Sequence, residues 1–182
     1  HDVERIERLI TDYSQMLKDE VAITNEQMKK IDLKLICTSV VDDFNNIYNS
    51  KNGIKIELTS NGSNNYNILG IENRIEQIIA NLLDNSISFS RENQTIKVVL
   101  SKDEKKKNIT LSVIDEGEGF KEKDTNKIFK RFYSNRPNKF GEHSGLGLNI
   151  VKNLVELHSG EISASNNVGQ KGAIIEIIFP KV

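Results

Sequence analysis

Apolar residues recur along this chain at two spacings, and each spacing predicts one kind of element. From Glu72 to Ser88 they lie three and four residues apart, which predicts an amphipathic helix with one buried face. Residues 54–58 alternate strictly between apolar and polar, as a half-buried strand does. By the same criteria we expect a helix over 40–48 capped by Ser39, a helix over 145–158, and strands over 32–38, 66–69, 95–101, 109–114, 161–164 and 173–179.

The order of these elements predicts the fold class. Strands first alternate with helices and then follow one another as hairpins, so we expect an α+β fold: a two-layer sandwich of a mixed sheet with helices on one face. The charged run 102–108 is expected to be a hairpin loop. Residues 115–144 form a long polar loop that contains glycine, and a loop of this length in a compact domain is usually functional.

Residues 2–18 carry a separate amphipathic pattern with one apolar stripe. A lone helix of this length is marginal in water and needs a partner for its stripe. The partner is either its own domain or a second helix in a bundle, and the charged stretch 19–30, which is typical of a linker, favours the bundle. The chain starts at His1 without an initiator Met, so we expect it to be a fragment of a longer protein.

Composition excludes several classes. The 182 residues include 25 basic and 26 acidic ones, and a net charge of −1 gives no basic excess for a general nucleic-acid surface. No apolar run in the sequence is long enough to cross a bilayer, and the start is not a signal peptide. The single Cys37 excludes an internal disulfide and is expected to be a small buried apolar residue.

Two asparagines, Asn81 and Asn85, lie four residues apart on one face of the helix predicted over 72–88. Amide oxygens suit Mg²⁺, a hard cation that keeps much of its water and shares phosphate ligands. Either asparagine on its own would be explained as a solvent-exposed residue on the helix surface. Because Asn is a mediocre helix former, however, the pair on a core-packed helix points to a function.

Residues 115–120, Asp-Glu-Gly-Glu-Gly-Phe, follow the strand predicted over 109–114. Glycines let the backbone turn sharply and approach a ligand closely. The Asp115 carboxylate, at the end of the strand, can accept a hydrogen bond from an exocyclic amine such as that of adenine. An acidic turn is the alternative explanation, and as a lone motif this one is weak.

Two further motifs lie in and after the long loop. Residues 128–133 place aromatic side chains inside it, and Lys130 or Arg131 can meet a phosphate there. The alternative is a small apolar cluster that anchors the loop through its two phenylalanines. Residues 144–148, Ser-Gly-Leu-Gly-Leu, open a helix, where backbone N–H groups form an anion site and glycines let a phosphate come close.

In this order, the four motifs resemble those of the ATP-binding domain of bacterial sensor histidine kinases. Residues 81–90 resemble the N box, 115–119 the first glycine box, 128–133 the F box, and 145–148 the second glycine box. The resemblance covers most of the chain, from residue 31 onward. It implies the Bergerat ATP-binding fold, which gyrase-type ATPases and related chaperones share.

The resemblance implies a role for each motif. Asp115 would contact adenine, Asn81 and Asn85 would hold Mg²⁺ and the phosphates, and residues 116–144 would form a mobile lid over the nucleotide. Catalytic roles would fall to Asn81, Asn85 and Arg131. The residues expected to bind the nucleotide are Asn81, Asn85, Ser88, Asp115, Gly117, Gly119, Phe120, Lys130, Arg131, Phe132, Ser144, Gly145, Leu146, Gly147 and Leu148.

Asn81 bears on the reaction. The related ATPases typically carry a glutamate at this position, where it activates water. An amide cannot act as a general base, so Asn81 favours phosphoryl transfer to a protein side chain over hydrolysis.

The chain departs from the family pattern at two places. The N box lacks its usual terminal Lys or Arg, so we expect Arg91, Lys130 or Arg131 to supply a cation for the phosphates. Residues 142–144 stand before the second glycine box where glycine is common, and they are expected to stiffen the lid.

The family's phosphoacceptor histidine is not expected within this chain. It occurs in a His-Glu/Asp-x-x-x-Pro pattern, and residues 1–6 lack the proline. Residues 1–30 resemble instead the second helix of the dimerization hairpin with its linker, ahead of a catalytic ATP-binding domain over 31–182. His143 falls in the lid, and His158 is expected to cap carbonyls at a helix end. The fragment should bind ATP and fail to phosphorylate itself.

The resemblance also implies partners and a location. They are ATP or ADP, the phosphoacceptor helix of the parent kinase and a response regulator, in a parent that is a homodimer anchored in the bacterial inner membrane with this domain in the cytoplasm. No nucleic acid is expected. Two rival interpretations stay open: a nucleotide-binding regulator without catalysis, and a serine kinase of the same fold. The predicted dimerization helix argues against the second.

Overall fold

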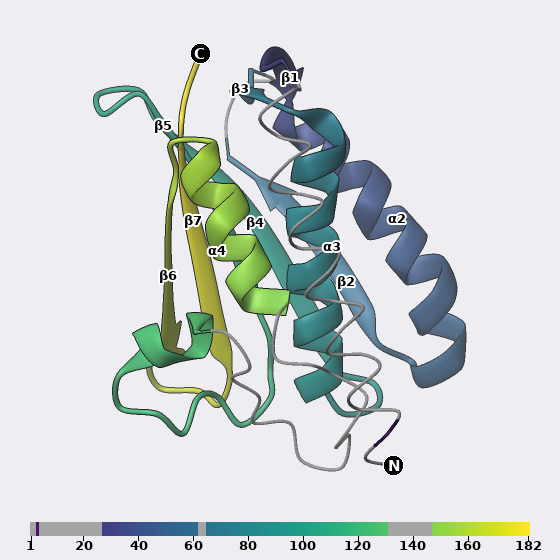
Figure 1. Ribbon diagram of the computed structural model, residues 1–182. Coiled ribbons are helices and arrows are strands. Elements are labelled where there is room, and N and C mark those ends of the chain that lie inside the picture. Colours follow the sequence, from purple (N-terminus) through teal and green to yellow (C-terminus); the bar gives the residue numbers. More distant parts are fainter. Residues whose placement is uncertain (1–2, 4–26, 62–64, 131–146) are drawn as a thin grey trace.

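The computed structural model describes residue 3 and residues 27–61, 65–130 and 147–182, and it shows helices layered on a sheet (Figure 1). The main sheet has five strands in the order β2-β4-β5-β7-β6. β2 and β4 are parallel and all other neighbours are antiparallel, so the sheet is mixed, as predicted. The strands span Lys55–Ser60 (β2), Thr95–Asp103 (β4), Asn108–Ile114 (β5), Glu161–Asn166 (β6) and Ala173–Pro180 (β7).

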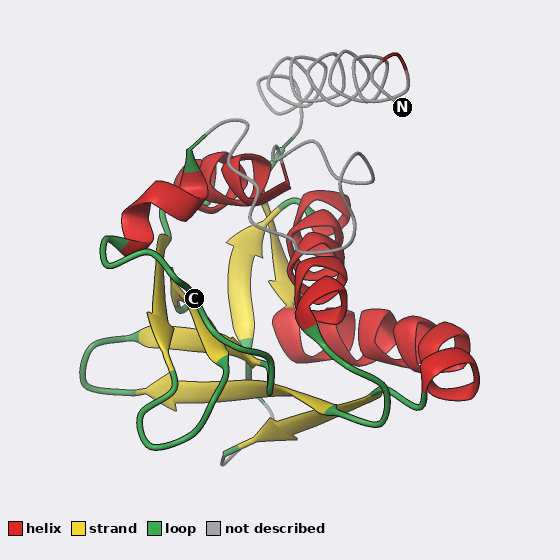
Figure 2. Cartoon of the chain, turned by 90° about the horizontal axis from the view of Figure 1, so that it is seen from below, coloured by secondary structure: helices red, strands yellow, loops and turns green. Residues whose placement is uncertain are grey.

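Three helices lie together on one side of this sheet: α2 (Leu33–Asn52), α3 (Glu72–Phe89) and α4 (Gly147–Leu157) (Figures 1 and 2). A smaller antiparallel sheet pairs β1 (Lys29–Asp32) with β3 (Asn67–Gly70). The predicted α+β sandwich is therefore confirmed. The strand predicted over 66–69 is β3 and the helix predicted over 72–88 is α3, each within one or two residues of its predicted bounds.

The core forms where the alternating residues of the strands meet the apolar stripes of the helices. Ile96, Val98 and Leu100 of β4 are fully buried, and the residues between them are more exposed. The predicted face of α3 is buried in the same core cluster. Its buried apolar residues are Ile75, Ile78, Ile79, Leu82, Leu83 and Ile87.

The strand predicted over 32–38 and the Ser39 cap are wrong. β1 ends at Asp32, and α2 begins at Leu33. The Asp32 side chain caps this helix, because its Oδ1 accepts a hydrogen bond from Leu35 N at 3.2 Å. A short apolar run such as residues 33–37 fits either period, and the helical spacing appears only when Val40 and Val41 are included.

Cys37 lies in the core, whereas most of the predicted N-terminal segment cannot be compared with the structure. Apart from residue 3, the helix predicted over 2–18 lies outside the described residues, as does most of the linker over 19–30, although the linker's last two residues belong to β1. Cys37 is buried as expected, and burial raises the pKa of its thiol to about 12. Within the part of the chain that the structure describes, no helix has both the length and the apolar content needed to cross a bilayer.

His158, directly after α4, connects that helix to the start of α3. Its ring Nδ1 lies 2.7 Å from Leu154 O, and its Nε2 accepts a hydrogen bond from Ile71 N at 3.1 Å. Because Nε2 is an acceptor, the ring is neutral with its proton on Nδ1, which donates to the carbonyl. The predicted capping role is confirmed, and burial lowers the pKa of His158 below its ordinary value.

We predict that this histidine makes stability depend on pH. The unfolded chain takes up the proton near pH 6.5, whereas the folded protein takes it up only at lower pH. The stability that the neutral His158 side chain contributes is therefore complete above pH 6.5. It is lost as the pH falls from there through the folded-state pKa. Urea unfolding at pH 7.5 and 5.0 should show a larger loss for the wild type than for His158→Gln, which cannot be protonated. Equal losses would contradict the assignment.

Candidate functional site

The structure brings the described parts of all four motifs to one end of the molecule. The C-terminal half of α3, the end of β5, the short 3-10 helix η1 (Thr125–Phe129) and the start of α4 gather there (Figure 1). Strand register explains part of this, because Ile114 at the end of β5 pairs with Ile174 at the start of β7. Gly117 then passes so close to the end of α3 that a Cβ on it would lie 2.7 Å from Phe89 O.

Asp115 is the buried charged group of this end. Its side chain is 4% exposed, and its Oδ1 accepts hydrogen bonds from Gly117 N at 2.9 Å and Ala173 N at 3.1 Å. Burial raises the pKa of the carboxyl, and the two backbone N–H groups oppose that rise. Because both hydrogen bonds use Oδ1, the carboxylate is held in one orientation, with Oδ2 as the oxygen suited to a ligand donor.

Gly172 is a site residue that the sequence analysis missed. Its φ is +139°, and a Cβ on it would lie only 2.0 Å from Asp115 O. Any side chain here would push the Asp115 backbone out of place. The signal in the sequence was a glycine directly before the strand predicted over 173–179.

The loop after Asp115 is fastened by a second missed residue, Asn166 at the end of β6. Its Oδ1 accepts from Phe120 N at 2.6 Å, and its Nδ2 donates to Phe120 O at 3.1 Å. Gly119 adopts a φ of +83°, and a Cβ on it would lie 2.6 Å from Asn166 Oδ1. The second glycine of this box is thus required for the approach of the loop to Asn166.

In the N box, Asn85 is buried and Asn81 is half-buried, one turn apart on α3 as predicted. The Ser88 hydroxyl donates to Asn85 O at 2.6 Å, so its proton is used within the helix. Arg91, one of the cations suggested for the phosphates, instead lies 3.3 Å from Glu118 in an exposed ion pair.

The F box is anchored on the domain in its first half. Ile128 and Phe129 of η1 are buried, which supports the apolar anchor, while Lys130 is exposed. Asn149 of α4, also missed, donates from Nδ2 to Phe129 O at 3.0 Å. Its Oδ1 is buried and has no hydrogen-bond partner within the described residues. The loop is therefore held at both Phe120 and Phe129, so the predicted lid is anchored over its first part.

Several predicted residues lie outside the described ranges: Arg131, Phe132, His143, Ser144, Gly145 and Leu146. The second glycine box is represented by Gly147, the first residue of α4, and by the half-buried Leu148. Among the described residues, no atom would lie within 4 Å of a Cβ on Gly147, in contrast with the crowded Gly117. The part of the chain that the structure describes therefore leaves the space beside the first turn of this helix unfilled.

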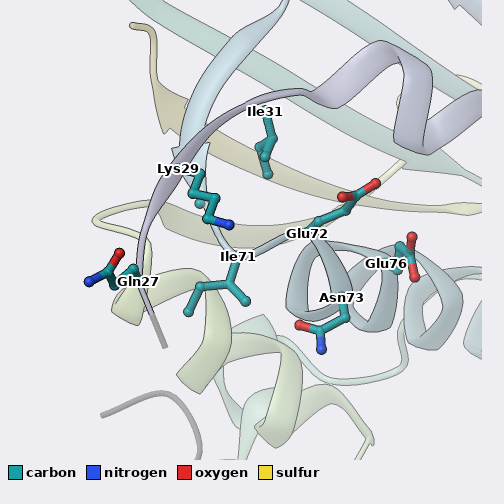
Figure 3. A pocket seen from close by; sticks show the side chains of 8 residues that line it. Gln27, Lys29, Ile31, Ile71, Glu72, Asn73 and Glu76 are labelled. Carbon is teal, nitrogen blue, oxygen red and sulfur yellow. The ribbon is translucent and has the colours of Figure 1, made fainter. Parts of the chain in front are cut away.

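A hollow of about 540 Å³ lies at the opposite end of α3 (Figure 3). Lys29 faces the first turn of α3 there, where Glu72, Asn73 and Glu76 stand. Asn85 is 13 residues beyond Glu72, or about 20 Å along the helix, so this hollow is separate from the four motifs.

We predict that Gly172→Ala destabilises the protein and Gly169→Ala serves as its control. Both glycines have positive φ, but a Cβ on Gly169 would meet no atom of the described residues within 4 Å. Gly169→Ala should therefore cost only backbone strain, about 1 kcal/mol. Gly172→Ala adds the collision with Asp115 O and should cost at least about 3 kcal/mol. Urea unfolding of both variants measures the difference, and equal costs would contradict the role of Gly172.

Comparison with known proteins supports the order of the motifs. The family model described as "Histidine kinase-, DNA gyrase B-, and HSP90-like ATPase" matches residues 70–182, more than half of the chain. The protein named "Sensor protein ChvG" of Rhizobium meliloti (strain 1021) is 34% identical over 180 residues, which are 96% of this chain and 31% of that protein. The chain thus spans about a third of the length of this relative.

Solved structures show the same fold. The catalytic domain of histidine kinase ThkA has a TM-score of 0.74 and 23% identity, with 86% of this chain and 97% of that chain covered. ThkA in complex with the response regulator protein TrrA gives a TM-score of 0.74 and 21% identity, over 97% of this chain and 49% of that chain. The family resemblance predicted from the four motifs is confirmed, and the chain belongs to the histidine kinase-, DNA gyrase B-, and HSP90-like ATPases.

Proposed function

We propose that this chain is the ATP-binding catalytic region of a two-component sensor histidine kinase. It presents the γ-phosphoryl group of ATP to a histidine on a helix outside the chain, for onward relay to a response regulator. The observation that carries this proposal is the buried Asp115 carboxylate, oriented by two backbone N–H groups beside the C-terminal end of α3.

Asp115 recognises adenine in this proposal. A buried carboxylate whose Oδ1 is already occupied has Oδ2 for the exocyclic amino group, which is a donor. Gly117 supports this role, because any side chain there would strike Phe89 O and Asp115 Oδ1. Burial also removes competing water, so that a hydrogen bond to the charged oxygen is stronger than at the surface.

The phosphates lie toward the start of α4 and the N box. The first N–H groups of α4 form the anion site, and no described atom would crowd a Cβ on Gly147 beside them. The half-buried Asn81 and the buried Asn85 offer amide oxygens, a donor set that fits Mg²⁺. When bound, Mg²⁺ neutralises phosphate charge. The exposed Lys130, with Arg131 next to it in sequence, supplies cationic contacts to the phosphates.

Asn81 does not supply a general base. Its amide can hold a ligand but cannot take a proton from water, so the site positions ATP and leaves the choice of acceptor to the delivered helix. Phosphoryl transfer depends mainly on positioning and charge, which these residues provide. The similarity to ThkA, solved in complex with a response regulator, supports onward relay to such a partner.

The arrangement of the parent protein is part of the same proposal. We propose that residues 1–30 belong to the dimerization hairpin and its linker, and that residues 31–182 form the catalytic domain. The parent is then a homodimer whose catalytic region faces the cytoplasm from a membrane anchor. ATP or ADP and the acceptor helix are its other partners.

We predict that Asp115→Asn abolishes ATP binding without unfolding the domain. Asn keeps an oxygen for Gly117 N and Ala173 N, but its NH₂ group then faces the amino group of adenine, donor against donor. Affinity should fall at least about 100-fold. Because the pKa of Asp115 is raised, its ionised form costs stability as pH rises through that value, and the neutral amide avoids this cost.

Calorimetry with Mg²⁺ and ATP on the wild type and Asp115→Asn checks this prediction. Thermal unfolding of both proteins controls for the fold. If the wild type itself binds no ATP, the kinase proposal fails, and a structural or regulatory role becomes the better account. If the variant binds as tightly as the wild type, adenine recognition lies elsewhere.

We predict that Asn85→Ala removes the dependence of ATP binding on Mg²⁺ and reduces phosphoryl transfer at least about 100-fold. Transfer is measured by adding a separately produced helical hairpin that carries the acceptor histidine. The product should be labile in acid, as phosphohistidine is, whereas an acid-stable product would indicate a serine kinase. Asp84→Ala, on the exposed side of the same turn, is the matched control.

A further inference from the structure

We propose that His158 is a positioning residue for the nucleotide site, because it sets the alignment of α4 along α3. The proposal rests on the function proposed above, and it assigns a task to a buried histidine that lies outside all four motifs. His158 is 4% exposed, and both of its ring nitrogens are engaged.

The two helices run antiparallel, fastened at one end. His158 directly follows α4, and Ile71 directly precedes α3, so the bond from Ile71 N to Nε2 joins the end of one helix to the start of the other. His158 is 11 residues after Gly147, or about 16 Å along α4. Asn81 and Asn85 lie 10 and 14 residues after Ile71, or about 15 and 21 Å along α3.

These lengths place the start of α4 level with the N box. Figure 1 shows the same relation, with the first turn of α4 beside the later turns of α3. A shift of one helix along the other would change the spacing between Gly147 and Asn85 by the same amount. Because a displacement of about 1 Å at a phosphate site is costly to function, this alignment has to be held closely.

Apolar packing constrains the alignment without directional bonds. α4 buries Ile150, Val151, Leu154 and Val155 in the core, and hydrophobic burial is itself non-directional. A hydrogen bond is directional and weakens when the helices slide. The imidazole makes one hydrogen bond to α4 and one to the residue before α3. It therefore adds a directional constraint on the position of α4 along α3.

The surroundings of the ring keep it in this position. The His158 backbone N lies 3.2 Å from Leu154 O and 3.1 Å from Val155 O, which fixes its own end of α4. On the other side, a Cβ on Gly70 would lie 3.0 Å from Cδ2 and 3.3 Å from Nε2. Ile71 has no side-chain cap for α3, and its carbonyl accepts from Arg74 N and Ile75 N. His158 thus fixes the peptide group from which α3 starts.

Two substitutions separate the two hydrogen bonds. The amide nitrogen of Asn can reach the position of Nδ1 and donate to Leu154 O, but Asn is too short to reach Ile71 N. The amide oxygen of Gln can reach the position of Nε2 and accept from Ile71 N. Cys37→Ser, on α2, is the control for loss of stability alone, because it places a hydroxyl in the core on a helix that makes neither of the two hydrogen bonds.

The test is calorimetry with Mg²⁺ and ATP on the 182-residue chain. His158→Asn should weaken ATP binding about three- to tenfold, while His158→Gln and Cys37→Ser should stay within about twofold of the wild type. Amide exchange of Ile71 should be faster in His158→Asn and protected in His158→Gln. A purely structural histidine would instead make affinity follow thermal stability across all three variants.

Gly70→Ala provides a second route if His158→Asn does not fold. Its Cβ would press on the ring and move Nε2 from Ile71 N, without changing the histidine. It should weaken ATP binding in the same direction. Wild-type affinity in Gly70→Ala, or in a folded His158→Asn, would overturn this inference and leave the kinase proposal standing. A wild-type chain that binds no ATP would overturn both.

Discussion

The burial of one carboxylate sets the form of the whole site. Asp115 lies at the end of a central strand with little solvent, and the loss of hydration disfavours its charge. Two backbone N–H groups offset that loss, and one of them belongs to the first residue of β7. The alignment of β5 with β7 and the absence of a side chain at Gly172 both follow from this requirement.

At the same end of the molecule, some parts are held by core packing and others by hydrogen bonds from side-chain amides. α3 and the sheet belong to the core, so the groups they carry are held by packing. The loop after Asp115 has few core residues of its own, and it is held by side-chain amides instead: Asn166 at Phe120 and Asn149 at Phe129. Fastening at these points gives this polar loop a defined path from the end of β5 to the end of η1.

Sequence reasoning succeeded where the signal is local and long. The face of α3 and the alternation in β4 span many residues, so their period is unambiguous. It failed over 32–38, where five apolar-rich residues fit a strand or a helix and an aspartate cap decided the outcome. The four motifs were predictable for a related reason, since each is a short run of neighbouring residues.

The contacts that complete the site are not local, and no short pattern encodes them. The bond from Ala173 to Asp115 spans 58 residues, that from Phe120 to Asn166 spans 46, and that from Ile71 to His158 spans 87. Each depends on which strands and helices become neighbours, and hence on the fold as a whole. Asn166 and His158 look in the sequence like ordinary residues at the ends of elements.

These long-range bonds matter more here than they would in a hydrolase. A site that carries a carboxylate base gains part of its rate from proton transfer as well as from positioning. In the proposed kinase, the amide of Asn81 supplies no proton chemistry, and the rate depends on where the phosphates are held. Residues that fix the relative positions of α3, α4 and β5 therefore contribute to function although they need not touch ATP. His158 and Gly172 are residues of this kind, and Asn166 does the same for the loop after Asp115.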